Sequence, residues 1–241
     1  MSGFFGIFRP QGGQIDLEAF EQMKTAMHRE GVDCMETHVE DKIAMGHLML
    51  RVSPESKYDK QPLKSSCGNY ILVGHFRLDY RDELGDKLGL TQTELELTPD
   101  SQLAMLAYQK WKEKCVHHLE GDWAFAVFNS SKNKIIFFRD HSGTSCLAYR
   151  KIDSFILFSS NINVLTNSTS YTPTIDKIQL CRLLVPGLGL RRKCTVFLDT
   201  FILSNSEILS YDQNLSPKSV ECGPFKIGDG AINFKYEKDY I

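Results

Sequence analysis

Apolar positions along this 241-residue chain recur with two different periods, and the changes of period divide the chain into short elements. From residue 121 the side chains alternate, with Trp123, Phe125 and Val127 on one face and Ala124 and Ala126 on the other. A period of two is typical of a β-strand. Similar short runs predict strands at 3–8, 34–39, 43–50, 70–76, 134–139, 146–150 and 155–159, and a last hairpin from 196–203 and 207–210.

Helical spacing of apolar residues appears between these strands. Asp16 is suited to cap a helix that carries Leu17, Phe20, Met23 and Met27 on one stripe. Further helices are predicted over 82–88, from a Thr98 cap with Pro99 in the first turn to about Lys114, and over 175–184.

The order of these elements determines the predicted fold class. Strands follow one another at antiparallel spacing with helices between them, which predicts an α+β fold of two mainly antiparallel sheets flanked by helices. Residues 52–66 are polar and contain prolines, as in a loop, and the chain becomes polar and weakly patterned after residue 216. We therefore expect a folded domain over 1–210 and a linker or tail over 211–241.

Composition and charge narrow the class of function. The formal net charge is −2 and the isoelectric point is about 6.4, which gives no electrostatic reason to expect nucleic acid or an anionic membrane as a partner. The seven cysteines are odd in number and contain no C-x-x-C, which favours reduced thiols and a cytoplasmic protein. No run of about 18 apolar residues predicts a membrane span.

One cluster invites a metal interpretation. Cys115, His117 and His118 lie close together in the sequence, but their spacing suits no common zinc site and no fourth ligand is evident. We therefore expect neither a metal nor another cofactor in this chain.

Two sequence blocks resemble a known family. Residues 119–128 (L-E-G-D-W-A-F-A-V-F) and 138–143 (F-R-D-H-S-G) are similar to the pattern L-x-G-D-[FW]-A-F-A … R-D-x-x-G of asparagine synthetase-type amidotransferase domains. Further parts of the pattern match at 46–47 (G-H), 61–63 (Q-P-L), 77–84 (R-L-D-Y-R-D-E-L) and 158–165. The resemblance covers about residues 2–210 and is closest to the branch with lasso-peptide macrolactam synthetases and β-lactam synthetase.

The resemblance implies a four-layer αββα sandwich whose N-terminal residue is the nucleophile. The family start M-C-G-I-x-G-I aligns with residues 1–7, which places Ser2 at the position of the catalytic cysteine. In the family this cysteine attacks the side-chain amide of glutamine, and its own α-amino group, with a pKa of about 8, acts as the base. Removal of Met1 would expose Ser2 as the N-terminus, although its hydroxyl ionises far less readily than a thiol.

The alignment also places changed residues where the family binds glutamine. The first arginine of the family motif G-H-R-R-L binds the glutamine carboxylate, and its position is occupied by Leu48. A leucine cannot pair with a carboxylate. Arg51 lies three residues further along the strand, where its side chain is expected on the other face.

The alignment also gives the residues at the positions of the family's oxyanion hole and of its site for the substrate amine. In the family motif N-G-E-I-Y-N the asparagine amide and the glycine N–H form the oxyanion hole, and the aligned residues are His75 and Phe76. Asp100 keeps the acidic position that holds the substrate amine. Each residue also has a purely structural alternative: Ser2 as a small residue at a strand start, His75 as a satisfied strand histidine, and Asp100 as a carboxylate in the first turn of a helix.

The second half of the family is not found in this sequence. That half carries an S-G-G-x-D-S loop, which binds the pyrophosphate of ATP through backbone N–H groups. Residues 142–145 (S-G-T-S) form part of the R-D-x-x-G block, and we reject them as a phosphate loop. ATP and magnesium are therefore expected only in a partner, either a PP-loop ATPase domain or a separate synthetase chain.

These losses lead to one main hypothesis and three alternatives. The main hypothesis is a degenerate amidotransferase domain that scaffolds an ATP-dependent, amide-forming synthetase, as in macrolactam formation, where the attacking amine already belongs to the substrate. The alternatives are an amidohydrolase with Ser2 as nucleophile for a different amide or ester, an interaction module with a filled pocket, and an active glutamine amidotransferase. The sequence leaves the oligomeric state open, a homo-oligomer included.

Overall fold

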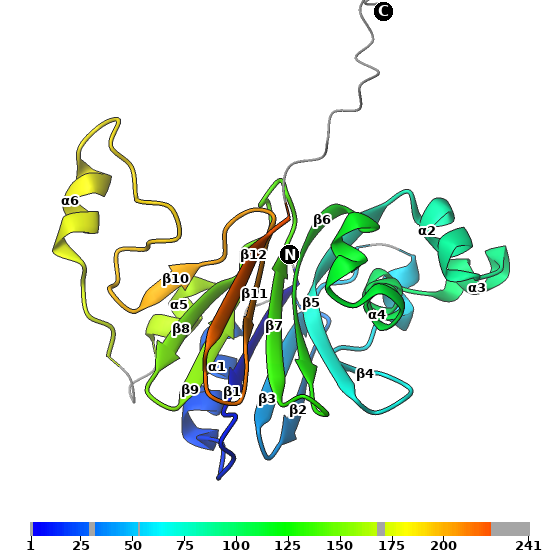
Figure 1. Cartoon of the computed structure of the whole chain (residues 1–241), viewed down its shortest axis with the longest axis horizontal. Coiled ribbons are helices and arrows are strands. Elements are labelled where there is room, and N and C mark those ends of the chain that lie inside the picture. Colours follow the sequence, from blue (N-terminus) through cyan, green and yellow to red (C-terminus); the bar gives the residue numbers. More distant parts are fainter. Residues whose placement is uncertain (1, 29–31, 53, 168–171, 223–241) are drawn as a thin grey trace, which may run out of the picture.

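The computed structural model describes residues 2–28, 32–52, 54–167 and 172–222. Two six-stranded sheets lie face to face, and helices cover the outer face of each (Figure 1). This is the α+β sandwich of two mainly antiparallel sheets that the sequence predicted, and every strand pair is antiparallel.

The first sheet contains the N-terminal strand and has the order β10-β8-β9-β1-β3-β2. Helices α1 and α5 cover its outer face. The bounds are β1 (Gly3–Phe8), α1 (Leu17–Met27), β2 (Cys34–Glu40), β3 (Ile43–Met49), β8 (Ala148–Ile152), β9 (Phe155–Ser159), α5 (Ile162–Thr166), α6 (Lys177–Leu184) and β10 (Thr200–Ile202).

The second sheet has the order β12-β11-β7-β6-β5-β4, and its outer face is covered chiefly by α4. The 3-10 helices η1 and η2 lie before β4 and after α4. The bounds are η1 (Glu55–Tyr58), β4 (Leu63–Lys64), β5 (Tyr70–Asp79), α2 (Arg81–Leu88), α3 (Gln92–Leu97), α4 (Asp100–Trp111), η2 (Lys112–His117), β6 (Glu120–Asn129), β7 (Lys134–Arg139), β11 (Glu207–Tyr211) and β12 (Pro217–Glu221).

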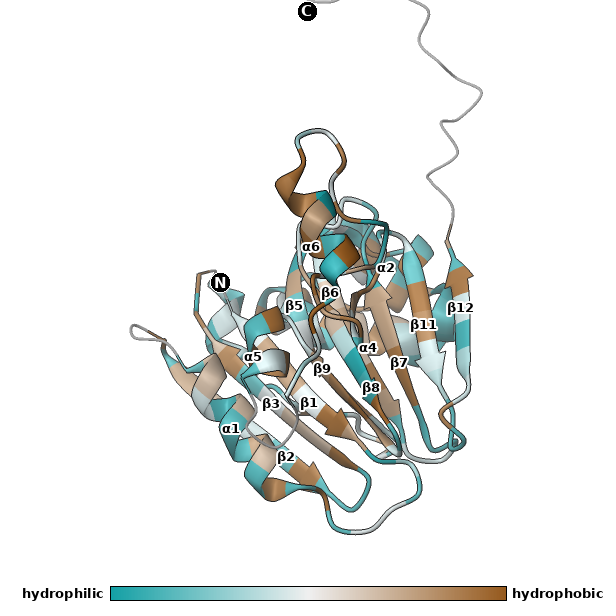
Figure 2. Ribbon diagram, turned by 90° about the vertical axis from the view of Figure 1, so that its left-hand side faces the viewer, coloured by the Kyte–Doolittle hydropathy of each residue, from teal (hydrophilic) through white to brown (hydrophobic). Residues whose placement is uncertain are grey.

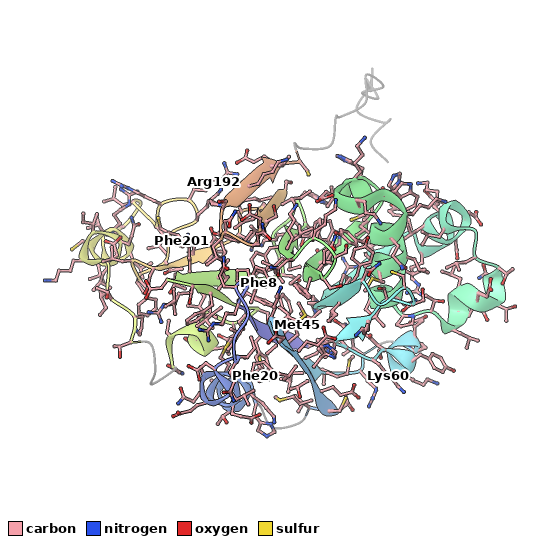
Figure 3. The ribbon with its side chains drawn as sticks, turned by 60° about the horizontal axis from the view of Figure 1, so that its bottom comes forward. Phe8, Phe20, Met45, Lys60, Arg192 and Phe201 are labelled. Atoms are coloured by element: carbon pink, nitrogen blue, oxygen red, sulfur yellow. The ribbon has the colours of Figure 1, made fainter. Side chains whose placement is uncertain are left out.

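Three apolar layers hold the sandwich together. Phe8 and Met45 belong to the layer between the sheets, whereas Phe20 of α1 packs on the outer face of the first sheet (Figure 3). Phe125 belongs to the third layer, between the second sheet and α4. Because strand side chains alternate, neighbouring residues of one strand enter different layers. This alternation decides which side chains reach the candidate site.

The start of α4 differs from its prediction. Pro99 is the N-cap of α4 and Thr98 is the C-cap of α3, a helix that the sequence did not predict. A capping box between Thr91 and Glu94 begins α3. The hydroxyl of Thr98 donates to the carbonyl of Glu94 (2.7 Å), so Thr98 ends the preceding helix instead of capping the next one.

The predicted last hairpin is wrong. Strand β10 pairs with β8 in the first sheet, whereas β11 pairs with β7 in the second, so the chain crosses between the sheets after Ile202. The guanidinium of Arg139 donates to the carbonyls of Leu203 (2.5 Å) and Ser145 (2.8 Å) at this crossing. Short apolar runs at hairpin spacing do not show that two strands share a sheet.

The second sheet continues past the expected end of the fold. Strand β12 pairs with β11 from Glu207↔Glu221 to Tyr211↔Pro217, within the stretch that the sequence assigned to a tail. All five residues of β12 are exposed, which explains why its pattern was missed. The remainder of the expected tail, 223–241, lies outside the described residues.

Candidate functional site

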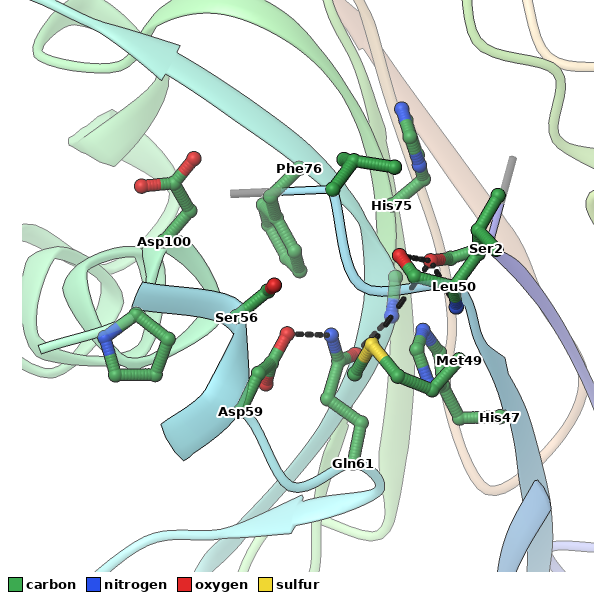
Figure 4. A pocket seen from close by; sticks show the side chains of 13 residues that line it. Ser2, His47, Met49, Leu50, Ser56, Asp59, Gln61, His75, Phe76 and Asp100 are labelled. Carbon is green, nitrogen blue, oxygen red and sulfur yellow. Dashed lines mark hydrogen bonds between the residues drawn. The ribbon is translucent and has the colours of Figure 1, made fainter. Parts of the chain in front are cut away.

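A cleft of about 150 Å³ lies beside Ser2, between the end of β3, the edge of β5 and the start of α4 (Figure 4). Five described residues between β3 and β4 form the remaining wall: Leu50, Val52, Ser56, Asp59 and Gln61. The edge of β5 is open here because β4 pairs only with Ile71 and Leu72. The residues that line the cleft are Ser2, His47, Met49, Leu50, Val52, Ser56, Asp59, Gln61, Gly74, His75, Phe76, Pro99 and Asp100.

Ser2 lies at the mouth of the cleft with its hydroxyl bound to the main chain. Its Oγ accepts a hydrogen bond from the N–H of Leu50 (3.0 Å) and donates to the carbonyl of Leu50 (3.3 Å). Its position is fixed because Gly3, the first residue of β1, pairs with Leu48 of β3. The hydroxyl therefore has to leave the Leu50 carbonyl before it can attack a ligand.

The structure separates Leu48 from the cleft that contains Phe76. Leu48 is buried among the side chains that pack under α1, and it lines a second hollow of about 280 Å³ on the other side of Ser2. Strand alternation turns Met49 into the cleft instead. The two arginine positions of the motif G-H-R-R-L are thus occupied by two apolar side chains, one on each face of β3.

Arg51 does not replace the missing cation. Its side chain is exposed, and its Nη2 lies 3.8 Å from the thiol of Cys34. Among the described residues that line the cleft there is no Lys or Arg. A carboxylate of an amino acid would find no cationic partner in this arrangement.

The edge of β5 presents a backbone donor that the sequence analysis missed. The N–H of Gly74 donates to Oε1 of Gln61 (2.8 Å), and the N–H of Leu78 donates to Oδ2 of Asp100 (2.9 Å). Phe76 lies between them and has its N–H on the same edge, because alternate residues of a strand direct their N–H groups to the same side. Its neighbour Trp123 on β6 exchanges hydrogen bonds with Asp140 and not with Phe76.

The side chains of Phe76 and His75 border the cleft without filling it. The ring of Phe76 packs against that of Phe125, with 5.2 Å between centroids. His75 lines both hollows and so lies beside Ser2. Burial lowers the pKa of His75, which keeps its imidazole neutral at pH 7.

Asp100 is fixed by a structural partner. Its Oδ1 is bound by Nη1 of Arg81, and the same guanidinium donates to the carbonyls of Leu95 (3.1 Å) and Thr98 (2.7 Å). Burial raises the pKa of Asp100, and the N–H of Leu78 and the charge of Arg81 oppose this shift. Asp100 thus connects α2, α3 and α4 to the edge of β5. It also lines the cleft.

Asp59 and His47 also line the cleft, although the sequence analysis gave them no role. Oδ1 of Asp59 accepts from the hydroxyl of Ser101 (2.6 Å), and its Oδ2 accepts from Nε2 of Gln61 (3.1 Å). Burial raises the pKa of Asp59 and lowers that of His47 to about 4. The only sequence signal for Asp59 was its place two residues before the Q-P-L match.

The described residues give no support for the metal site that was considered from the sequence. No group of three or more described His, Cys, Asp or Glu side chains is arranged to hold a metal ion. Cys115 is buried, and the ring of His118 stacks on Trp111 with 4.0 Å between centroids. None of the described helices is both long and apolar enough to cross a membrane.

Comparison with known proteins gives the same fold. The chain is 15% identical to the glutamine phosphoribosylpyrophosphate amidotransferase of B. subtilis, solved with ADP and GMP, with a TM-score of 0.59 over 91% of this chain and 49% of that one. A second solved structure, an allosteric regulatory enzyme of purine biosynthesis, has a TM-score of 0.58 at 14% identity over 91% of this chain and 48% of that one. The αββα arrangement expected from the sequence is therefore confirmed.

Sequence relatives are asparagine synthetases. Asparagine synthetase [glutamine-hydrolyzing] 3 of Bacillus subtilis is 26% identical over 71% of this chain and 28% of its own length. A putative asparagine synthetase [glutamine-hydrolyzing] 2 of Methanocaldococcus jannaschii is 26% identical over 67% of this chain and 34% of its own length. The chain thus matches about a quarter to a third of the length of these relatives.

The family assignment extends over nearly all of the described fold. The glutamine amidotransferase domain family matches residues 1–220, from the strand that follows Ser2 to the penultimate residue of β12. The chain therefore belongs to the glutamine amidotransferase domain family.

Proposed function

We propose that this domain no longer hydrolyses glutamine and instead serves as a non-catalytic part of an asparagine synthetase-like, ATP-dependent amide-forming system, such as one that forms peptide macrolactams. The proposal rests on the absence of any Lys or Arg side chain among the described residues that line the cleft. Met49 and Leu48 occupy the two arginine positions of the family motif, and Arg51 points elsewhere. Ser2 in place of cysteine further weakens the nucleophile.

A large apolar surface supports a role in assembly. Helix α6 and the loop after it project beyond the two sheets (Figure 2). Leu184, Ile178 and Leu183 of α6 are 72%, 63% and 54% exposed, and Leu188 in the loop is 50% exposed. Contiguous apolar surface of this kind marks sites of protein interaction. We call α6 and residues 185–190 the apolar arm.

The position of the apolar arm favours one partner, a synthetase domain or chain that binds ATP. Most of each asparagine synthetase relative lies outside the match to this chain. The C-terminal end of β12 lies at the same end of the molecule as the apolar arm (Figures 1 and 2). Arg192, just after the arm, forms an ion pair of 2.9 Å with Glu221 at the end of β12. The end of the described fold therefore lies beside this surface.

Co-expression with a PP-loop synthetase chain from the same source tests the scaffold role. Wild-type protein is expected to co-purify with it, and Leu184→Glu is expected to weaken the complex at least tenfold. Leu17→Glu, which alters a 47%-exposed leucine on α1, is the matched control and should leave the complex intact. Full synthetase activity without this domain, or equal binding by both variants, would contradict the proposal.

A second candidate function rests on the N–H of Phe76, for which no hydrogen-bond acceptor is seen among the described residues. A Ser2 hydroxyl, a neutral His75 and one backbone donor lie around one cleft, which is the minimum for attack on an amide other than glutamine. Treatment with an electrophilic acylating probe, followed by intact mass measurement, tests this alternative. An adduct on Ser2 freed of Met1 would support an amidohydrolase, and its absence would remove this candidate.

A further inference from the structure

We propose that the cleft beside Ser2 binds a primary ammonium group at the carboxylate of Asp59, in a ligand that has no carboxylate next to its amine. The inference rests on the proposed function in one respect, which is the missing clamp for an amino-acid carboxylate. It adds the class of ligand that the cleft accepts. In a system whose synthetase uses an amine already present in its substrate, that amine is the natural occupant.

The first support is that Asp59 lacks a cationic partner at hydrogen-bond distance in the described structure. Its two hydrogen bonds come from Ser101 and Gln61, which are both neutral. Arg51 exerts only a weak attraction on it, with its own guanidinium at the Cys34 thiol. A carboxylate that is largely withdrawn from water is costly unless an opposite charge meets it.

Asp100, the second carboxylate of the cleft, makes a bound cation more favourable. Asp100 is paired with Arg81, but its charge still raises the pKa of Asp59. Among its described residues the lining contains two carboxylates and no Lys or Arg, and burial keeps its two histidines neutral at pH 7. An ammonium group beside Asp59 would relieve this repulsion.

His47 supplies an independent indication of a polar ligand. Its ring is only 2% exposed and lines the cleft, yet its Nε2 has no hydrogen-bond partner within the described part of the chain. The ring is neutral at pH 7, and it interacts with the carbonyl of Gly74. A neutral imidazole that donates from one nitrogen accepts at the other. The unpartnered nitrogen is an acceptor for an N–H donor, and its residue lines the same cleft as Asp59.

The remaining walls define the rest of the ligand. Met49, Val52, Phe76 and Pro99 line the cleft with apolar atoms, so a short alkyl chain fits beside the charged end. The total volume of about 150 Å³ is several times the volume of about 30 Å³ that one water occupies in the liquid. The ligand class is thus a primary amine on a short apolar chain.

Titration of the purified full chain with n-butylammonium chloride tests the proposal, with sodium butyrate and glutamine as matched probes. Calorimetry at pH 7 and low salt is expected to show binding of butylammonium only. Asp59→Asn should weaken that binding about tenfold or more. Asp41→Asn, which alters an exposed carboxyl at the opposite end of β3, should not change it.

The wild-type protein alone also gives a decisive result by NMR. Butylammonium is expected to shift the ring signals of His47 and the side-chain amide of Gln61, whether or not Asp59→Asn folds. Unchanged signals, or equal binding to Asp59→Asn and wild type, would overturn the amine site and leave the proposed function standing. Binding of glutamine as tight as that of butylammonium would contradict the missing clamp, and both proposals with it.

Discussion

At the scale of single residues, the cleft is controlled by hydrogen bonds that hold reactive groups in unreactive states. The hydroxyl of Ser2 has a donor and an acceptor in the main chain of Leu50, so a productive attack first breaks an existing bond. His47 is withdrawn from water, which makes its protonation unfavourable. Asp100 is committed to Arg81 and the edge of β5. The contributions of His47 and of the Asp100 pair to the free energy of unfolding can therefore be measured with variants.

The buried His47 is expected to make the fold sensitive to mild acid. The folded state has a pKa of about 4 at this ring, and the unfolded state has the ordinary value of 6.5. The unfolded state therefore takes up the proton first as pH falls, and stability present above pH 6.5 is lost toward pH 4. Between pH 7 and pH 5 the wild type should lose about 2 kcal/mol more in urea unfolding than His47→Leu.

The exposed His117 provides the control for this experiment. His117→Leu removes an exposed histidine outside the cleft and so controls for the loss of a histidine side chain. A wild-type protein whose stability is as flat between pH 7 and pH 5 as that of His47→Leu would show that His47 is accessible to protons.

Loss of Arg81 should destabilise the fold more than loss of the nearby Arg77. Arg81 and Asp100 are only 21% and 22% exposed, so Arg81→Ala leaves a poorly solvated carboxylate without its partner. We expect a loss of roughly 2–4 kcal/mol in urea unfolding at pH 7. Arg77 is 58% exposed in its pairs with Asp79 and Asp122, and Arg77→Ala should cost less than about 1 kcal/mol. Equal losses would contradict the structural role of Asp100.

At the scale of elements, most strands could be predicted from their patterns, β4 and β12 being the exceptions, but their partners could not. Alternation within 43–50 already put Leu48 and Met49 on opposite faces. It did not say which face met the cleft, because that depends on the pairing of β1 with β3. Asp59 lies in a loop without a pattern, and its role depends on Ser101, which is 42 residues away in sequence. Side chains whose position in the cleft depends on contacts with distant residues are thus the least predictable part of the site.

The junction of β5 and β6 offers a test at this scale. Gly121 has φ +119°, and a Cβ added there would lie 2.1 Å from the carbonyl oxygen of Arg77, which cannot easily move. Gly121→Ala should therefore lose roughly 3 kcal/mol or more in urea unfolding. Gly68 also has a positive φ, +75°, but nothing lies within 4 Å of its added Cβ. Gly68→Ala should cost about 1–2 kcal/mol, and a similar loss in both variants would argue against the tight contact.

At the scale of the whole molecule, an intact sandwich carries an altered cleft and an exposed apolar arm. The three apolar layers and the antiparallel pairings keep the αββα architecture although the sequence is only 15% identical to that of the solved amidotransferase. Under the proposed function, this fold serves as a rigid support for a neighbouring synthetase unit. The apolar arm and the end of β12 lie together at one end of the molecule, where such a unit would attach.

The most direct test of the central claim is the release of ammonia from glutamine by the purified protein with Ser2 as its first residue. Because no described residue of the cleft offers a Lys or Arg side chain to the glutamine carboxylate, we expect no release above that of a Ser2→Ala variant. Ammonia that forms in proportion to wild-type protein, and that disappears with Ser2→Ala, would contradict this account.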